Sequence, residues 1–125
     1  MTRILMYNID GKKSVEIKNL CRKLNIGYTD VDKADYGYTL GYLLGESADN
    51  TKREGEDFSD EMLYLSEFSD GILNLFLSLL RKRKCPVKLK AVMTETNKTF
   101  TSFELYNEIS AEHRALKNGE TYHQA

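Results

Sequence analysis

Stretches with the apolar pattern of strands alternate along this chain with stretches that have the apolar spacing of amphipathic helices. The strand-like stretches are residues 3–9, 28–31, 62–68 and 87–93. Each is followed by apolar residues at helical spacing, as in Ile17, Leu20, Cys21 and Leu24. Strands and helices that alternate in this way are typical of a parallel sheet with right-handed crossovers. The order βαβαβαβα therefore predicts an α/β fold with one four-stranded, mainly parallel sheet, helices on both faces and the flavodoxin-like strand order 2-1-3-4.

Capping residues mark where several of the helices begin and end. Thr101 and Glu104 have the spacing of a capping box, and Ser69 is in position to cap the third helix. Pro86 prevents that helix from continuing, and Gly45 is suited to end a helix predicted over residues 36–44. The last helix is predicted to stop at residue 118.

The bulk composition indicates a single globular domain over residues 1–118, followed by a frayed tail at 119–125. Of the 125 residues, 41% are hydrophobic and 30% are charged, which is close to the average for globular proteins. Residues 46–60 are almost wholly polar and rich in acids, so they predict a flexible acidic loop. The net charge of −1 gives the whole molecule no attraction to nucleic acid or to anionic lipid.

The sequence predicts a cytoplasmic location and no membrane association. The first residues lack the basic-then-apolar order of a signal peptide, and no apolar stretch has the length of a membrane span. Cys21 and Cys85 are isolated, so we expect reduced thiols and no zinc site. The carboxylate ladder of Glu104, Glu108 and Glu112 is predicted to be a solvated helix face, so we expect no metal.

Two nucleotide- or phosphate-dependent classes are disfavoured by missing residues. Residues 11–14 resemble part of a phosphate-binding loop, but Met6 stands where the Walker pattern needs a glycine. A phosphorylated receiver domain would need a fifth strand in addition to acids such as Asp10 and Asp70. We therefore expect no cofactor.

Several segments of the chain form a pattern that is specific when they are taken together. They are residues 40–45, 61–65, 89–98 and 100–101, with Leu105, Glu112 and His113. Together they resemble a family of small, uncharacterised bacterial proteins that is frequent in Firmicutes and is described only as a domain of unknown function. The family pattern has Trp where this chain has Phe100. The resemblance implies no catalytic residue, because the family has no assigned activity.

Residues 81–90 form a basic segment without any acid. The cations are Arg81, Lys82, Arg83, Lys84, Lys88 and Lys90. Nucleic-acid binding is one interpretation of such a segment, and stabilisation of a helix C-terminus is another. We favour the second, because the acidic loop at residues 46–60 is expected to lie beside this segment and to neutralise it in part.

A glycine strip over the second helix gives a hypothesis about self-association. Gly37 and Gly41 are separated by one helical turn, with Tyr38 and Tyr42 beside them. Close packing within the chain would explain the strip, and a homodimer contact is the alternative.

Polar residues that follow the first and fourth strands form the candidate ligand site. They are Asn8, Asp10, Thr94, Glu95, Thr96, Asn97 and Lys98. In a parallel sheet both groups would emerge at the carboxyl end, where α/β proteins bind ligands. Local turn capping by the residue 94–98 segment is the competing interpretation.

The sequence favours a non-enzymatic domain that binds a small ligand or a protein, since no nucleophile–base pair is evident. The alternative is an enzyme acting on an anionic substrate at the carboxyl end of the sheet. It would use Asp10 or Glu95 as base, and Lys98 with helix N-terminal amides as the anion site.

Overall fold

The computed structural model describes residues 1–117, so the tail predicted at residues 119–125 lies outside the described part of the chain. The strands are β1 (Arg3–Tyr7), β2 (Gly27–Asp30), β3 (Met62–Ser66) and β4 (Leu89–Val92). The helices are α1 (Gly11–Lys23), α2 (Leu40–Leu43), α3 (Asp70–Lys82) and α4 (Ser102–Lys117), with 3-10 turns η1 (Lys33–Asp35) and η2 (Asn97–Thr99). This order confirms the predicted alternation of strands and helices.

The strands form one sheet in the order β2-β1-β3-β4, which is the predicted order. The outer pairs, β1 with β2 and β3 with β4, are parallel as expected. The central pair is antiparallel: Arg3 lies opposite Ser66, and Tyr7 lies opposite Met62. The sheet is therefore mixed, and it is mainly parallel as predicted; it departs from the expected parallel crossovers only at its centre. The reason is that the chain between β2 and β3 leaves and re-enters the sheet at the same end, so β3 runs back against β1.

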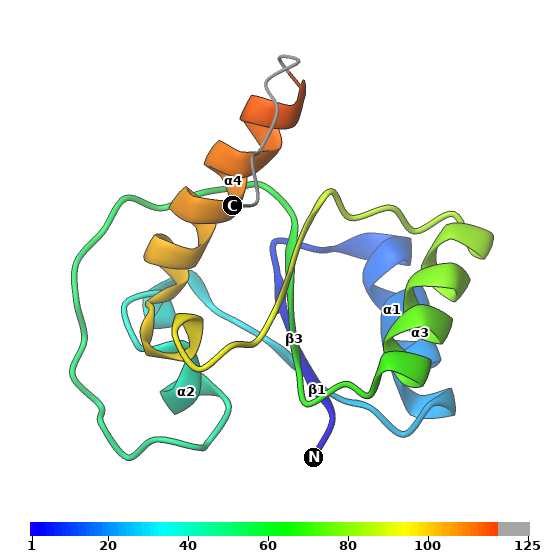
Figure 1. Ribbon diagram of the computed structural model, residues 1–125, viewed down its shortest axis with the longest axis horizontal. Helices are drawn as coiled ribbons and strands as arrows, with labels where there is room; N and C mark the ends of the chain where they lie inside the picture. Colours follow the sequence, from blue (N-terminus) through cyan, green and yellow to red (C-terminus); the bar gives the residue numbers. More distant parts are fainter. Residues whose placement is uncertain (118–125) are drawn as a thin grey trace.

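Helices cover both faces of the sheet, as predicted (Figure 1). The face that carries Ile4 and Leu63 packs against α1 and α3, and these residues share a core with Ile17 and Phe76. The opposite face packs against α2 and α4 in a separate core. The buried residues of this second core include Leu5, Tyr7, Tyr36, Leu40, Phe58, Met62, Tyr64, Leu89, Phe103 and Leu105. The sheet thus separates two apolar layers.

The predicted caps form, but the second helix is shorter than expected. The Ile72 amide donates to Ser69 Oγ at 3.2 Å, and the capping box joins Thr101 N to Glu104 Oε1 at 2.8 Å. Residues 36–39 lie outside α2 because their backbone groups bond to other segments. The carbonyl of Tyr36 accepts from the Ser102 amide at 3.1 Å, and that of Gly37 accepts from the Arg53 amide at 2.9 Å. Gly45 follows α2 with a φ of 80°, as its predicted role requires.

The segment at residues 46–60 has no regular secondary structure, in agreement with the prediction of a loop. It is attached to the domain at Phe58, whose side chain is only 5% exposed. The Phe58 ring stacks between Tyr36, at a centroid distance of 4.7 Å, and Tyr106, at 4.1 Å. Sequence analysis did not predict this contact, since a single aromatic residue among acids gives no periodic signal.

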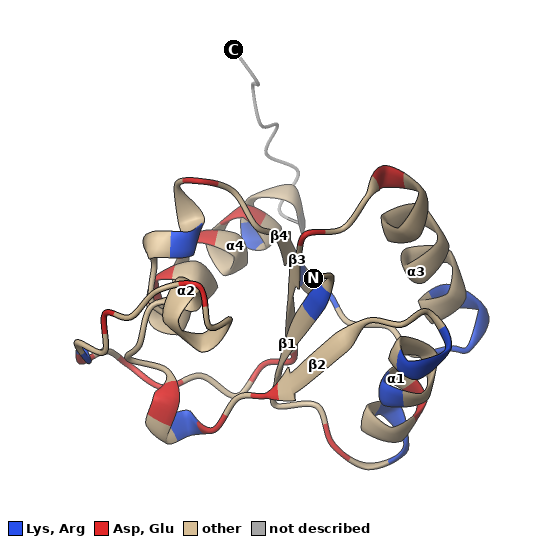
Figure 2. Cartoon of the chain, turned by 90° about the horizontal axis from the view of Figure 1, so that it is seen from below, with Lys and Arg blue, Asp and Glu red and all other residues tan. Residues whose placement is uncertain are grey.

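The acidic loop does not lie beside the basic segment, contrary to expectation. The loop runs past α2 and α4, whereas the basic end of α3 lies across the sheet from it (Figure 2). In the described part of the chain, the only ion pair of the basic segment joins Arg83 to Glu16 of α1. The predicted neutralisation failed because the acids at residues 49–57 follow the opposite face of the sheet.

Within residues 1–117, no helix has the length and apolar character that crossing a membrane requires.

Candidate functional site

The structure divides the predicted ligand site between two ends of the sheet. Asn8 and Asp10 follow the carboxyl end of β1, and the residue 94–98 segment follows the carboxyl end of β4. Because β4 is parallel to β3 and β3 is antiparallel to β1, these carboxyl ends point in opposite directions. The two groups of residues therefore cannot share one ligand.

Asn8 holds the acidic loop in place. It adopts a left-handed φ of 59°, a conformation that asparagine tolerates better than most residues. Its Nδ2 donates to the carbonyls of Phe58 and Asp60 at 3.1 and 3.0 Å, and its Oδ1 accepts from the Tyr36 hydroxyl at 3.1 Å. All the bonding groups of the amide face the protein, so Asn8 has a structural role.

Asp10 is exposed at the start of α1, where it lines an open pocket of about 390 Å³. Asp30 and Asp32 also line this pocket. The Asp30 carboxylate is paired with Lys18 at 2.5 Å, and Lys33 of the pocket donates to the carbonyl of Phe58 at 2.7 Å. Asp30 and Lys33, two of the four charged residues that line the pocket, are thus used to hold α1 and the loop.

Asn97 closes the turn after β4, which supports the capping interpretation of this segment. Its Oδ1 accepts from the Thr94 amide at 2.8 Å and from the Tyr64 hydroxyl at 2.6 Å. Its Nδ2 donates to the Val92 carbonyl at 3.0 Å, and its own amide donates to Thr94 Oγ1 at 2.9 Å. Thr94 and Asn97 therefore satisfy each other and the end of β4, and the amide side chain of Asn97 is fully engaged within the chain.

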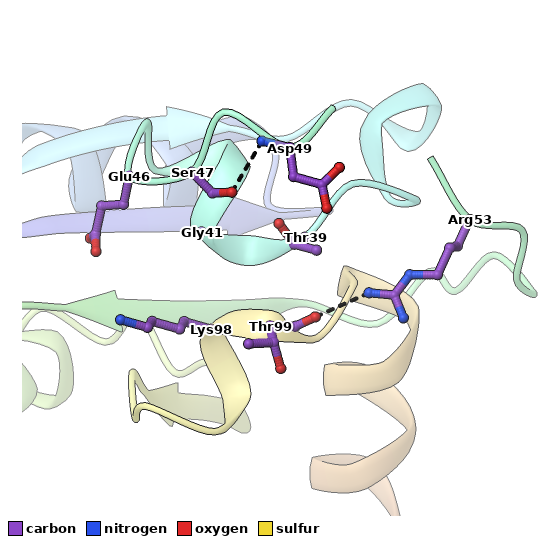
Figure 3. Close-up of a pocket in the computed structure, with 8 residues that line it drawn as sticks. All are labelled: Thr39, Gly41, Glu46, Ser47, Asp49, Arg53, Lys98 and Thr99. Atoms are coloured by element: carbon purple, nitrogen blue, oxygen red, sulfur yellow. Dashed lines mark hydrogen bonds between the residues drawn. The ribbon is translucent and has the colours of Figure 1, made fainter. Parts of the chain in front are cut away.

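Lys98 is the one residue of the predicted set that lines the pocket between the acidic loop and the connection from β4 to α4 (Figure 3). We call this the loop pocket. Its volume is about 510 Å³, within the usual range of small-molecule sites. The lining residues are Thr39, Gly41, Glu46, Ser47, Asp49, Arg53, Lys98 and Thr99. Figure 3 shows the side chains of Glu46 and Asp49 extending from the loop toward the side of the pocket formed by η2.

Arg53 and Lys98, the two cations of the loop pocket, each make contacts within the chain that leave some of their N–H donors available. Arg53 donates to the carbonyl of Thr99 at 3.0 Å and lies 3.4 Å from the Glu104 carboxylate. Lys98 pairs with Glu95 at 3.0 Å, and the hydrogen bond and charge of Glu95 raise the pKa of Lys98. A guanidinium has five N–H donors and an ammonium three, so both groups can bind a further anion.

The carboxylates of the pocket lie on the loop. Hydrogen bonds from Thr51 lower the pKa of Asp49, because they favour its charged form. Ser47 Oγ accepts from the Asp49 amide at 3.2 Å, which fixes this part of the loop and leaves the Ser47 hydroxyl proton free to donate. The loop side of the pocket thus presents anionic oxygens and a hydroxyl group.

Gly41 brings the two sides of the loop pocket together. A Cβ built on Gly41 would lie 3.3 Å from the carbonyl oxygen of Lys98, and one built on Gly37 would overlap the carbonyl oxygen of Arg53. Both glycines are therefore covered by this chain's own backbone, which is the close-packing explanation of the strip. The rings of Tyr38 and Tyr42 lie beside it, with centroids 4.7 Å apart.

Sequence analysis missed Glu46, Asp49 and Arg53 as site residues. The available signal was the long polar loop itself, since long loops without secondary structure are often functional. Which of its side chains would face η2 depends on the tertiary fold, and no local pattern records it.

The two thiols lie in the apolar interior. Burial raises the pKa of Cys21 to about 12 and also raises the pKa of Cys85, so both are protonated at neutral pH. Within residues 1–117, no three His, Cys, Asp or Glu side chains are grouped so that they could hold a metal ion.

Comparison with known protein families gives a match over the second half of the described chain. No characterised protein and no solved structure matches the chain significantly. Residues 61–116 match the model of a family described as Domain of unknown function (DUF3783). The match begins just before β3, so it excludes residues 40–45, and it includes the other segments that carried the resemblance. The segment from β3 to α4 is thus similar to the DUF3783 family, whose description assigns no activity.

Proposed function

We propose that this protein is a non-enzymatic binding domain whose loop pocket takes a small zwitterionic ligand of the amino-acid class. The observation that carries the proposal is the charge arrangement of that pocket. It presents the carboxylates of Glu46 and Asp49 together with the cations Arg53 and Lys98. A ligand with an ammonium and a carboxylate would complement both, with the guanidinium of Arg53 suited to bind the carboxylate.

The hydroxyl groups of the pocket support a polar ligand over an apolar one. Thr39, Ser47 and Thr99 all line it. Thr39 Oγ1 accepts from the Tyr42 amide at 3.2 Å, which leaves its proton to donate. A ligand carboxylate between Arg53 and these hydroxyl groups would accept several hydrogen bonds at once.

Some of the residues that the sequence suggested for the alternative hypothesis, an enzyme, are far apart in the structure or already engaged. Asp10 lies at the other end of the sheet from Lys98, and Glu95 is engaged by Lys98 itself. Hydrogen bonds keep the pKa of Asp49 low, which makes this carboxylate a poor general base at neutral pH. These features favour recognition over proton transfer.

Titration of the isotope-labelled protein with free amino acids, followed by amide chemical shifts, tests the proposal. We expect shifts at Gly41, Ser47 and Thr99, and about tenfold weaker binding of the N-acetyl and amide derivatives, each of which lacks one charge. Asp49→Asn and Lys98→Gln should weaken binding by a similar factor. Lys23→Gln, on the exposed face of α1, is the matched control and should have no effect.

An absence of shifts at millimolar amino acid would refute a zwitterion site. Equal binding of the acetylated or amidated derivatives would also contradict it, because one of the two charges would then contribute nothing.

A further inference from the structure

The basic segment of α3 and β4 borders a groove that the proposed function does not use. Leu77, Leu80 and Val87 line this groove, and Arg81, Lys88 and Lys90 are the cations at its border. Its volume is about 290 Å³. We call it the β4 groove. It lies on the α3 side of the sheet, whereas the loop pocket lies on the side of α2 and α4.

We propose that the β4 groove binds an extended acidic peptide segment, which adds as a strand to the free edge of β4. Three independent features carry this inference: an open strand edge, an apolar surface beside it, and unpaired positive charge around both.

The edge of β4 is available over its middle residues. β4 is the last strand of the sheet, with β3 as its only neighbour. The Met93 amide donates to the Leu65 carbonyl of β3 at 2.9 Å, so the backbone groups of alternate residues before it, Ala91 and Leu89, also face β3. The backbone groups of Lys90 and Val92 therefore point outward. The Val92 carbonyl is taken by Asn97, which leaves the Lys90 amide and carbonyl and the Val92 amide for a partner.

The same alternation leaves one face of β4 without a helix over it. Leu89 belongs to the core on the α2 and α4 side, so Lys90 and Val92 face the α3 side. Val92 is 45% exposed there, although it is an aliphatic residue in a strand. A side chain of an added strand, directed into the groove, would cover Leu77 and Val87 together with this surface.

The positive charge around the groove has no internal partner. Arg81, Lys82, Lys84, Lys88 and Lys90 are exposed, and none of them forms an ion pair with any residue in the described range 1–117. Lys90 donates instead to the carbonyl of Val87. Partial desolvation of the Lys90 ammonium and the nearby charge of Arg81 lower the pKa of Lys90, so an acidic partner would relieve an unfavourable environment for this group.

The lining of the groove favours a peptide over a nucleic acid. Single-stranded nucleic acids bind proteins largely by stacking their bases on aromatic rings. The groove is lined instead by aliphatic side chains, Cys85 and Pro86, together with the three cations. Aliphatic pockets beside an open strand edge are what strand-adding peptides use for their alternate side chains.

The test uses an eight-residue peptide of alternating Glu and Val, acetylated and amidated so that it offers no free termini to the loop pocket. Binding is followed by fluorescence anisotropy and by amide shifts of the labelled protein. We expect shifts at Leu77, Arg81 and Lys90 that weaken as salt is added. A peptide N-methylated at every residue, which cannot donate to β4 from either edge, should bind about tenfold more weakly.

Variants of the protein separate the groove from general charge attraction. Lys88→Glu combined with Lys90→Glu should abolish binding, while Lys23→Glu with Lys12→Glu makes the same change in net charge on α1 and should leave it intact. Circular dichroism confirms that each double variant is folded.

Three results would overturn the proposal. One is the absence of amide chemical shift changes around β4 at millimolar peptide. The lysines would then serve only to protect the strand edge against pairing with other chains. Another is unchanged affinity after N-methylation. The third is tighter binding of a single-stranded oligonucleotide of equal charge to the same residues.

Discussion

Replacing Asn97 by Ala should destabilise the protein strongly. The Asn97 side chain forms hydrogen bonds both to the end of β4 and to the hydroxyl of the buried Tyr64. Tyr64 is fully buried, and its hydroxyl donates to Asn97 Oδ1 at 2.6 Å. Leaving that hydroxyl without its partner costs about 1–3 kcal/mol, and the two exposed bonds to Thr94 and Val92 contribute roughly 0.5–1 kcal/mol each. The sum is a loss of about 3 kcal/mol, which corresponds to a fall of roughly 10 °C in Tm.

Urea unfolding followed by far-ultraviolet circular dichroism measures this loss as a shift of the midpoint. Thr96→Ala is the matched control, since Thr96 is exposed in the same turn and its side chain makes no hydrogen bond within the described part of the chain. Introducing Tyr64→Phe into Asn97→Ala should recover about 1 kcal/mol or more, because it removes the orphaned hydroxyl. A loss for Asn97→Ala no larger than that of Thr96→Ala would refute this account of the turn.

Further predictions concern the acidic loop, the glycines and the thiols. Brief trypsin treatment of the native protein should cut first after Lys52 or Arg53, which lie in an exposed stretch, and first cuts elsewhere would show that the loop is held. Gly37→Ala should overlap the Arg53 carbonyl, lower stability by about 1–3 kcal/mol in urea unfolding and speed that cleavage, whereas Gly71→Ala, which meets no atom within 4 Å, should do neither. Cys21 should resist a thiol reagent at pH 7 until the protein unfolds, and rapid labelling of the folded chain would contradict its burial. Self-association through the glycine strip of Gly37 and Gly41 remains a prediction. It would be contradicted if sedimentation equilibrium at high concentration gave the mass of a monomer.

Much of the fold could be predicted from the sequence because each element carries its own local signal. The spacing of Ile17, Leu20 and Cys21 predicted a helix face, and all three are buried against the sheet. The capping box of Thr101 and Glu104 marked the start of α4 correctly. Such signals depend only on residues that are close together in the sequence, so they can be recognised without the tertiary structure.

The direction of β3 has no comparable local signal. A parallel β3 would require the chain to cross to the amino end of β1 before residue 62. Residues 46–60 can instead return the chain to the carboxyl end of β1. They are long enough to do so, because fifteen extended residues span roughly 50 Å, whereas a five-residue strand is only about 17 Å long. The anchor of Phe58 on Tyr36 and Tyr106 then fixes the return. A long loop of this kind leaves strand direction undetermined.

The error in the candidate site follows from that one direction. Asn8 and Lys98 were placed together because both follow a strand that was expected to be parallel, and reversing β3 with β4 moves Lys98 to the other end. The polar character of the residue 94–98 turn was recognised, and Lys98 does line a pocket. The rest of that pocket comes from a loop whose side chains follow no period.

The antiparallel centre of the sheet also has a consequence for the order in which the chain folds. Arg3 pairs with Gly27 on one side and with Ser66 on the other, so β1 acquires its two neighbours from very different distances along the sequence. The unit of β1, α1 and β2 closes over a short separation, whereas β3 must close a loop of roughly 60 residues. On a ribosome that adds about 5–20 residues per second, the second edge of β1 stays unpaired for about two to seven seconds while the chain from β2 to β3 is made. During that interval the nascent chain exposes one unpaired edge of the apolar strand β1, which later lies inside the sheet between β2 and β3.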